Sequence, residues 1–474
     1  MAEYSLKPVD VPRIKTKYRA IRTKLPVPQS LPIFKALKRS EPRSMMGQPP
    51  VVWHEADNFV VRDRWGNQWI DWSSGVLIAN AGHNRGEIRK AVRKVMDQGL
   101  MASYVFVHER RAELTMLLQG LAPDPKNYSS FLLTTGSEAT ENCIKLAKTY
   151  AFEKYGPEKR FFVTFSNAFH GRTLGAQLAG GIPKLKKWIG DSDKSFIQVP
   201  FPDGFHNENL SFDLFLETLR SQGIEPGKVA GVMSESYQGG GPDFLPVEYA
   251  KKLEAFCREH DIVLAMDEVQ SGFGRTGKWF CFQHYGIKPD LIVCGKGISS
   301  SLPIAAVIGR KEIMDMYPPG SMTSTHSASP LPVAAAIANI KLIRREKLVE
   351  RAAKLGEIMM PELARLQARY PGALGCLHGK GLVAGLQVVK PGTKEPDAAT
   401  AQRINLACFH KGLLMFAPVG FGGHCIKIAP PLTIAGDALK EGLAVLGEAL
   451  DEVLGAGGTV AAAKRTPVRK VERR

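Results

Sequence analysis

Four short stretches of this sequence carry residues whose types and spacing could do chemistry together. The first is "LIVCGKGI", which places Lys296 directly after an apolar run and between two glycines. An ammonium group is costly to bury. Lys296 therefore either lies just past a strand end with its amine in water, or is kept in a pocket as a reactive amine, for example to form a Schiff base. The other stretches bear on this choice.

The second stretch, "IVLAMDEVQSGFGRTG", places Asp267 at the end of a buried run. A buried, ionised carboxylate needs a cationic partner, and the protonated nitrogen of a pyridine ring would be one. The alternative is a buried aspartate that is bonded only to backbone amides. The density of glycine and charged residues directly after Asp267 favours a functional site.

The third stretch, "FLLTTGSEATENCIKLAK", predicts a strand, a tight turn at Gly136 and a helix that Ser137 caps. Backbone N–H groups and the helix dipole make such a turn a phosphate-binding site, although plain helix capping explains the same residues. The fourth stretch, "SNAFHGRTLGA", places Phe169 and His170 after another strand. Phe169 could stack on a flat ring or pack in the core, and His170 alone would be a structural histidine.

The elements that must position these residues form an alternating pattern of strands and helices. Strands are predicted at 130–135, 160–166, 229–236, 261–268, 290–295 and 305–309, and helices at 137–156 and 246–261. This order predicts a mostly parallel sheet wrapped by helices. A hairpin at 59–72, a long helix near 330–355 and a closing helix at 435–455 complete the prediction.

Ligands of open parallel sheets bind outside the carboxyl ends of the strands, which is where all four stretches fall. A phosphate-binding turn, a carboxylate, an aromatic side chain and a lysine on one sheet edge predict a site for pyridoxal 5'-phosphate. Lys296 would form a Schiff base with the cofactor, and Asp267 would keep its pyridine nitrogen protonated. The reactive-amine interpretation of Lys296 is therefore the one we adopt.

Six motifs occur together in the order typical of one enzyme family: "TTGSEATENCIKLAK", "FHGRT", "ESYQGGG", "DEVQSGFGRTG", "CGKG" and "STHSASPLPVAAA". With them, the chain resembles the class III (omega) aminotransferases, a fold type I group that includes 4-aminobutyrate aminotransferase and dialkylglycine decarboxylase. The resemblance covers roughly residues 46–455. It implies an α/β fold with a large domain around a mostly parallel seven-stranded sheet, and a smaller α+β domain built from both chain ends.

The resemblance also implies an order of segments and a set of roles. The segments are a basic arm (1–45), the first part of the small domain (46–95), the large cofactor-binding domain (96–350), the rest of the small domain (351–455) and a basic tail (456–474). The implied cofactor-binding residues are Gly136 and Ser137 for the phosphate, Phe169 and Val269 for the two ring faces, Asp267 for the pyridinium, Gln270 for the phenolic oxygen, Lys296 as the catalytic residue, and also His170 and Glu235. Thr325 would reach the phosphate of a neighbouring subunit, so the resemblance implies a homodimer, and a tetramer could also form.

Three positions depart from the relatives and bear on the substrate. Gly240 stands where many glutamate-using relatives have a second glutamate, and Lys427 stands where they have an arginine that binds a substrate carboxylate. Lysine can bind a carboxylate only as a point charge, so we expect weaker discrimination for 2-oxoglutarate. Val76 replaces the glutamine of dialkylglycine decarboxylases, which counts against decarboxylation.

Charge and cysteine content limit the other function classes. The net charge of +17 lies mostly in the ends, because residues 1–45 carry eleven Lys or Arg against three Asp or Glu, and residues 459–474 carry six against one. Basic ends are typical of solvated segments, so nucleic-acid binding is not expected. Seven scattered cysteines without a C-x-x-C pair favour reduced thiols in the cytoplasm and no metal site. No apolar run is long enough to span a membrane, and no secretory signal is evident.

The sequence therefore predicts a transaminase that moves an amino group from an amine or amino acid, such as an omega-amino acid, to a small 2-oxo acid. The nearest alternative is an amino-acid racemase or epimerase of the same family, which would give no keto product. An alternative of another class is a non-catalytic binding protein that uses its basic ends.

Overall fold

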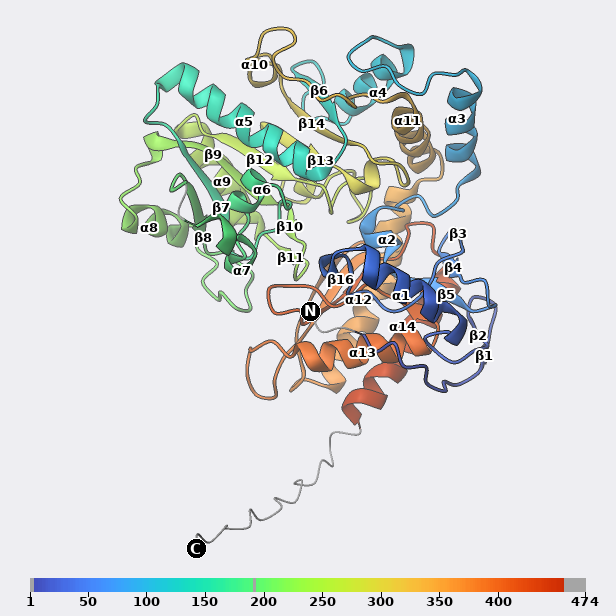
Figure 1. Ribbon diagram of the computed structural model, residues 1–474. Helices are drawn as coiled ribbons and strands as arrows, with labels where there is room; N and C mark the ends of the chain where they lie inside the picture. The colour runs from blue at the N-terminus through green and yellow to red at the C-terminus, as the bar shows by residue number, and fades with distance from the viewer. Residues whose placement is uncertain (1–3, 191–192, 456–474) are drawn as a thin grey trace, which may run out of the picture.

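A seven-stranded sheet forms the centre of the upper lobe of the computed structural model, which describes residues 4–190 and 193–455 (Figure 1). Its strands, in spatial order, are β6 (Tyr128–Leu133), β14 (Ala305–Arg310), β13 (Leu291–Cys294), β12 (Val263–Asp267), β9 (Val229–Glu235), β7 (Phe161–Phe165) and β8 (Phe196–Val199). β14 runs antiparallel to both of its neighbours, and the other pairs are parallel. The fold is thus the α/β architecture that the sequence predicts.

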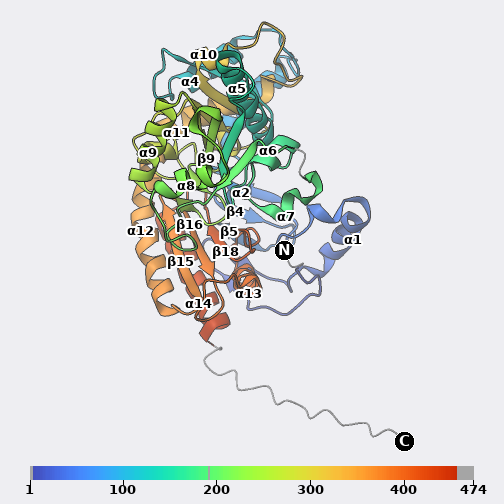
Figure 2. The ribbon, with the colours of Figure 1, turned by 90° about the vertical axis from the view of Figure 1, so that its left-hand side faces the viewer.

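The central strands β9, β12 and β13 are buried at every position, and mostly apolar, because helices cover both faces of the sheet. On β12, Val263 and Ala265 face one core cluster, whereas Leu264 and Met266 face the other. Figure 2 shows α5 and α9 on opposite sides of the sheet. The helices of this lobe are α3 (Gly86–Asp97), α4 (Glu109–Gln119), α5 (Gly136–Tyr155), α6 (Leu174–Ala179), α7 (Pro183–Lys186), α8 (Asp213–Ser221), α9 (Val247–Glu259), α10 (Lys311–Met314) and α11 (Pro330–Arg345).

The lower lobe is assembled from both ends of the chain. One sheet holds β1 (Ile14–Lys15), β2 (Ala20–Ile21), β5 (Gln68–Asp71), β4 (Val60–Arg62) and β3 (Glu55–Asp57), and β17 (Leu413–Leu414) pairs in parallel with β5. A second, antiparallel sheet holds β15 (Leu374–Lys380), β16 (Val383–Val388) and β18 (Cys425–Ile428). Its helices are α1 (Leu31–Ser40), α2 (Ser74–Leu77), α12 (Leu348–Arg369), α13 (Ala398–His410) and α14 (Gly436–Leu454).

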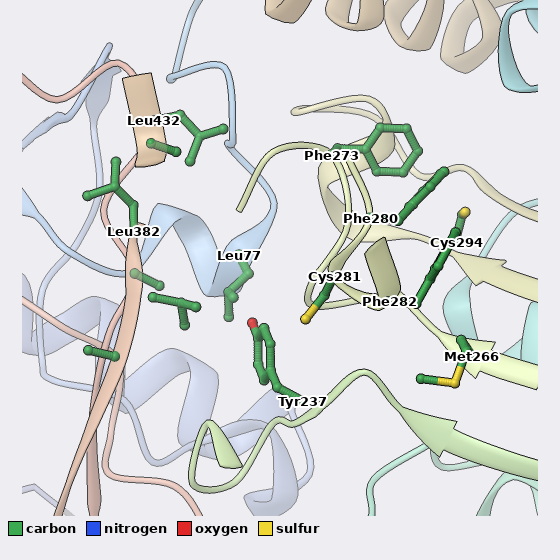
Figure 3. Packing of buried hydrophobic residues seen from close by; sticks show 14 of the residues in the cluster. Leu77, Tyr237, Met266, Phe273, Phe280, Cys281, Phe282, Cys294, Leu382 and Leu432 are labelled. Atoms are coloured by element: carbon green, nitrogen blue, oxygen red, sulfur yellow. The ribbon is translucent and has the colours of Figure 1, made fainter. Parts of the chain in front are cut away.

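One continuous apolar core joins the two lobes. Figure 3 shows Phe273 and Phe280, on the loop after β12, between Met266 and the lower-lobe residues Leu382 and Leu432, all of which belong to one buried cluster. The Arg275 side chain lies wholly inside this junction and donates to the carbonyl oxygens of residues 382 and 430 at 2.9 and 2.5 Å. The two lobes are therefore joined by a shared core and by the hydrogen bonds of Arg275.

The structure corrects three details of the sequence-based prediction. The helix expected near 330–355 is two helices, because Lys347 between them takes a left-handed φ of 52°. The cap of α5 is Thr135, whose side chain accepts from the Glu138 N–H in a reciprocal capping box, so Ser137 is not the cap. The edge strand β8 was not among the predicted strands. The hairpin β4–β5 forms as expected.

The division of the chain into five segments stays a prediction. Residues 14–21, within the predicted arm, supply β1 and β2 to the lower-lobe sheet. The predicted tail 456–474 lies outside the described residues. Across residues 4–190 and 193–455, no helix combines the length and apolar character that crossing a bilayer requires.

Candidate active site

Lys296 and Asp267 lie at the carboxyl ends of two neighbouring parallel strands. β12 and β13 pair directly, with Asp267 in register with Val293, as one strand-to-strand connection predicts. Lys296 begins the turn that follows β13 and has a left-handed φ of 41°. A non-glycine residue in this region costs energy, and such residues cluster at functional sites. Its side chain is enclosed by protein atoms but reachable from a cavity.

Asp267 is held from two sides in the described structure. Its Oδ1 accepts from the Val269 N–H at 2.9 Å, and its Oδ2 lies 2.8 Å from His170 Nδ1. Burial favours neutral His170, but the hydrogen bond and the negative charge of Asp267 outweigh it and raise the pKa of the imidazole. Asp267 therefore has a backbone donor and a buried imidazole as partners, and its pairing with a pyridinium stays a prediction. His170 Nε2 is buried without a hydrogen-bond partner among the described residues.

Glu235 ends β9, the other neighbour of β12, and fixes two loops of the site. Its Oε2 accepts from the Phe169 N–H and its Oε1 from the Gly239 N–H, each at 2.9 Å. Burial raises the pKa of this carboxyl group to about 7, although the positive charge of His170 opposes the shift. Glu235 therefore positions the backbone on which Phe169 is carried.

Glycine is needed where the two turns approach Val269. A Cβ on Gly136 would lie 3.0 Å from Val269 Cγ1, and one on Gly295 would lie 3.2 Å from the same atom. Ser137 lies against the loop after Phe169, since a Cβ on Gly171 would come within 2.4 Å of Ser137 Oγ. The structure therefore brings the predicted phosphate turn, Val269 and the Lys296 turn into contact.

A cavity of about 490 Å³ connects the two lobes beside these groups. Of the predicted site residues, Val76, Phe169, Gln270, Lys296 and Lys427 line it, as does Gly240. Glu235, Asp267 and His170 lie behind its wall. Thr325 does not line the cavity of its own chain and is exposed on the loop before α11.

Lys427 is buried in the wall of the cavity. Its Nζ donates to the Gln270 Oε1 at 2.7 Å and to the Gly239 carbonyl oxygen at 2.9 Å, and it lies 5.2 Å from the centre of the Tyr237 ring. Burial, aided by the charges of Lys296 and Arg275, lowers the pKa of Lys427 to about 7, although Cys425 and Glu235 act in the opposite direction. The amine is therefore partly neutral near neutral pH.

Gly240 is needed by the packing of the loop that faces it. A Cβ at this position would lie 3.1 Å from the Gly420 Cα. A side chain here would require the backbone at Gly420 to shift by a few tenths of an ångström, so the close approach of this loop suits a glycine.

Sequence reasoning missed several cavity residues that come from distant segments. They are Arg172, Gln238, Asp243, Gln387 and His424. Gln238 and Asp243 lie within or just after the "ESYQGGG" motif, so that motif could have indicated them. Gln387 and His424 lie in the C-terminal segment, where no local pattern marks them as cavity residues.

The sequence was compared with known proteins. The profile of class-III aminotransferases matches residues 43–450. The chain belongs to the class-III aminotransferase family. A 4-aminobutyrate aminotransferase of Mycobacterium leprae is 32% identical over 92% of this chain and 98% of its own length. A leucine/methionine racemase of Thermococcus litoralis is 33% identical over 85% of this chain and 91% of its own.

A solved Bacillus anthracis aminotransferase superposes on this class-III aminotransferase with a TM-score of 0.82, at 27% identity and with 92% of this chain and all of the other covered. The fold and the enzyme class predicted from the sequence are confirmed: the chain is a transaminase of the mixed, mostly parallel α/β architecture. The alternative of a non-catalytic binding protein is not supported.

Class-III aminotransferases depend on pyridoxal phosphate, and the residues present fit that group. Lys296 faces the cavity without a hydrogen bond or ion pair to the described residues, and burial lowers the pKa of its amine, although Asp267 and Glu235 oppose the shift. A buried carboxylate, a half-buried aromatic ring and a glycine-lined turn lie beside it. Among the described residues, no cluster of three or more His, Cys, Asp or Glu is placed to hold a metal ion.

Proposed function

We propose that this transaminase uses pyridoxal 5'-phosphate to move an amino group from an omega-amino acid or amine to a small 2-oxo acid. The observation that carries the proposal is the pairing of Asp267 with His170 at the strand end beside the partnerless amine of Lys296. The name of the Mycobacterium leprae relative supports 4-aminobutyrate as one such donor.

In this proposal the cofactor lies in the cavity between two side chains. Gly136 and Ser137 bind its phosphate with the first turn of α5, where N–H groups and the helix dipole favour an anion. Phe169 and Val269 contact the two ring faces, and Gln270 donates to the phenolic oxygen. The charge of Asp267, itself oriented by His170 and Val269, keeps the pyridine nitrogen protonated. When bound, the cofactor would supply the electron withdrawal that acidifies the substrate carbon.

Lys296 is the group that moves that proton. Burial lowers the pKa of its amine, so a neutral form is accessible to accept a proton from the substrate carbon and return it at the next position. The donor screen that tests the function incubates the holoenzyme with each candidate amine without an acceptor, and follows both the cofactor absorbance and the carbonyl product.

The racemase alternative keeps the same residues and changes the outcome. It is favoured by the Thermococcus litoralis relative, whose printed name is leucine/methionine racemase. A transaminase converts the donor to a carbonyl compound in the screen, whereas a racemase inverts the α-carbon of an amino acid and leaves no carbonyl product. Absence of any carbonyl product together with inversion of leucine or methionine would replace the proposed transfer reaction.

Lys427 is proposed to bind the carboxylate of the donor, which makes donor use dependent on pH. An ammonium with a pKa of about 7 loses its charge above that pH. We expect kcat/KM for 4-aminobutyrate to fall about ten-fold per pH unit above this pKa, because only the protonated amine binds the carboxylate. Lys427→Arg should remove this fall, since a guanidinium stays charged.

Butylamine, which has no carboxylate, is the matched control for the Lys427 prediction. In the wild-type enzyme, kcat/KM for butylamine should not show this fall above the pKa of Lys427. If kcat/KM for 4-aminobutyrate falls in the same way above this pKa in Lys427→Arg, another group titrates, and Lys427 does not bind the substrate carboxylate.

A shared site is proposed because Thr325 is exposed and outside the cavity of its own chain. If Thr325 binds the phosphate at the site of the second subunit, the Lys296→Ala and Thr325→Asp lesions of a mixed dimer fall in the same site. One site then carries both lesions and the other carries neither. Co-expression should restore about a quarter of the wild-type activity, since about half of randomly paired dimers are mixed.

The two parent variants, expressed alone, are the controls for this mixing experiment. Each should be nearly inactive, because the aspartate repels the phosphate dianion and the alanine removes the proton carrier. Co-expression without recovery would show that Thr325 does not serve a neighbouring subunit.

A further inference from the structure

A cysteine, a histidine and an aspartate form a hydrogen-bonded chain outside the proposed cofactor site. Cys376 Sγ lies 3.4 Å from His378 Nε2, and His378 Nδ1 lies 2.8 Å from Asp243 Oδ1. Cys376 and His378 are two residues apart on β15 and so share one face of the lower-lobe sheet. Asp243 begins β11 (Asp243–Phe244), which pairs with β10 (Tyr237–Gln238) in a hairpin of the upper lobe.

The hydrogen bonds define the protons on the ring. Burial favours neutral His378, but its hydrogen bonds to Asp243 and Cys376 outweigh burial and raise the pKa of the imidazole to about 10. At neutral pH the ring is an imidazolium, so Nδ1–H donates to Asp243 and Nε2–H donates to Cys376 Sγ. Of the seven cysteines, Cys376 therefore has a sulfur that accepts a hydrogen bond from a charged ring.

No other cysteine of the chain has this environment. The remaining six, Cys143, Cys257, Cys281, Cys294, Cys408 and Cys425, are at most 1% exposed, and burial raises the pKa of each thiol. Cys376 is 7% exposed, and the His378 side chain that covers it is 30% exposed. Small reagents therefore have a route to Cys376.

These hydrogen bonds extend from Asp243 to residues in the wall of the cavity. Gln387 Nε2 donates to Asp243 Oδ1 at 3.0 Å, and Gln387 Oε1 lies 3.2 Å from His424 Nε2. Asp243, Gln387 and His424 all line the cavity. A change at Cys376 is thus two hydrogen bonds away from groups that face the substrate.

We propose that Cys376 is an activated thiol that small oxidants such as hydrogen peroxide modify, and that its modification disturbs the cavity wall formed by Asp243 and Gln387. The thiolate attacks one peroxide oxygen, an S–O bond forms and the O–O bond breaks. The leaving hydroxide takes the Nε2 proton of the His378 imidazolium and becomes water. The sulfur is oxidised to a sulfenic acid and the peroxide is reduced.

Loss of the His378 proton affects the cavity wall through Asp243, which is hydrogen-bonded to the His378 ring. The ion pair between His378 and Asp243 becomes a bond between a neutral ring and a carboxylate, and the sulfenic oxygen occupies space beside the ring. Asp243, held at 6% exposure by this partner and by Gln387, is then no longer fixed by a cation. Turnover should fall because Asp243 and Gln387 line the cavity in which the substrate is proposed to bind.

The first test compares the seven thiols within the wild-type holoenzyme. Iodoacetamide labelling at pH 7, followed by peptide mass spectrometry, should modify Cys376 about ten-fold faster or more than any other cysteine. The factor reflects the other six thiols, which are at most 1% exposed and whose pKa burial raises, whereas Cys376 is more accessible and hydrogen-bonded to His378. In His378→Gln the rate at Cys376 should fall by a similar factor.

The second test links the modification to activity. Peroxide should lower wild-type turnover several-fold, a thiol reductant should restore it, and dimedone should trap Cys376. Cys376→Ser should keep its basal turnover and resist peroxide, whereas Cys425→Ser, a matched change on strand β18 of the same sheet, should remain sensitive. Labelling of Cys376 no faster than the buried thiols, or equal inactivation of Cys376→Ser and wild type, would overturn the proposal.

Discussion

Replacing Lys296 by alanine is expected to lower kcat by about four orders of magnitude. Proton transfer by a positioned side chain contributes roughly 10²–10⁴-fold, and loss of the nucleophilic amine adds to this. The variant should still bind pyridoxal phosphate, because the turn at Gly136 and the Asp267 carboxylate remain. Single-turnover rates and the absorbance of the bound cofactor measure the two effects separately.

Borohydride treatment of the wild-type holoenzyme identifies the lysine that bonds to the cofactor, which a loss of activity alone does not show. Peptide mapping should find the cofactor mass on the peptide that contains Lys296. Lys341→Ala, at an exposed lysine that pairs with Glu113, is the control and should keep full turnover. A cofactor mass on Lys427, the other buried lysine of the cavity, would exchange the roles proposed for the two residues.

Asp267→Asn is expected to lower kcat by about 10²-fold or more while the fold persists. Asparagine keeps the shape and one acceptor for the Val269 N–H, but it removes the charge that stabilises a protonated ring nitrogen. A 10²-fold fall in kcat corresponds to about 2.7 kcal/mol of lost transition-state stabilisation, because 1.36 kcal/mol is ten-fold in rate. Steady-state kcat and the cofactor spectrum check the result.

The adjacent carboxylate gives a matched control for Asp267. Glu268 is equally buried, but it accepts hydrogen bonds from Ser236 and Ser271 and from the N–H groups of residues 281 and 282, away from the cavity. Glu268→Gln should lower the free energy of unfolding and leave kcat of the folded enzyme within about two-fold. A larger loss of kcat in Glu268→Gln than in Asp267→Asn would contradict the role proposed for Asp267.

The sequence predicted the large sheet and the strand-end residues because both leave local signals. A strand covered on two faces is apolar throughout, as "LIVC" and "VLAM" are, and a polar residue at its end stands out. Lys296 and Asp267 were therefore found together with their neighbouring strands. The direction of β14 left no such signal, because a buried strand is apolar whichever way it runs.

Other features depend on contacts between distant residues. β8 has an alternating burial pattern at the sheet edge, so its sequence "FIQV" lacks the continuous apolar run that marks β13, which is equally short. The break at Lys347 involves no glycine or proline, so helix periodicity passes through it. Gln387 and His424 reach the cavity only because the lower-lobe sheet packs on the hairpin that carries Asp243.

The pairing of β5 with β17 has a consequence for how the chain folds. Ile70 and Asp71 pair with Leu413 and Leu414, and Trp69 stacks on Phe409, so contacts of the lower lobe span more than 300 residues of sequence. Non-local parallel pairing forms slowly, because loop closure must come before any contact is gained. During synthesis the first strands emerge long before their partners, which leaves the apolar side chains of Trp69 and Ile70 in need of protection by chaperones until the ribosome has nearly finished.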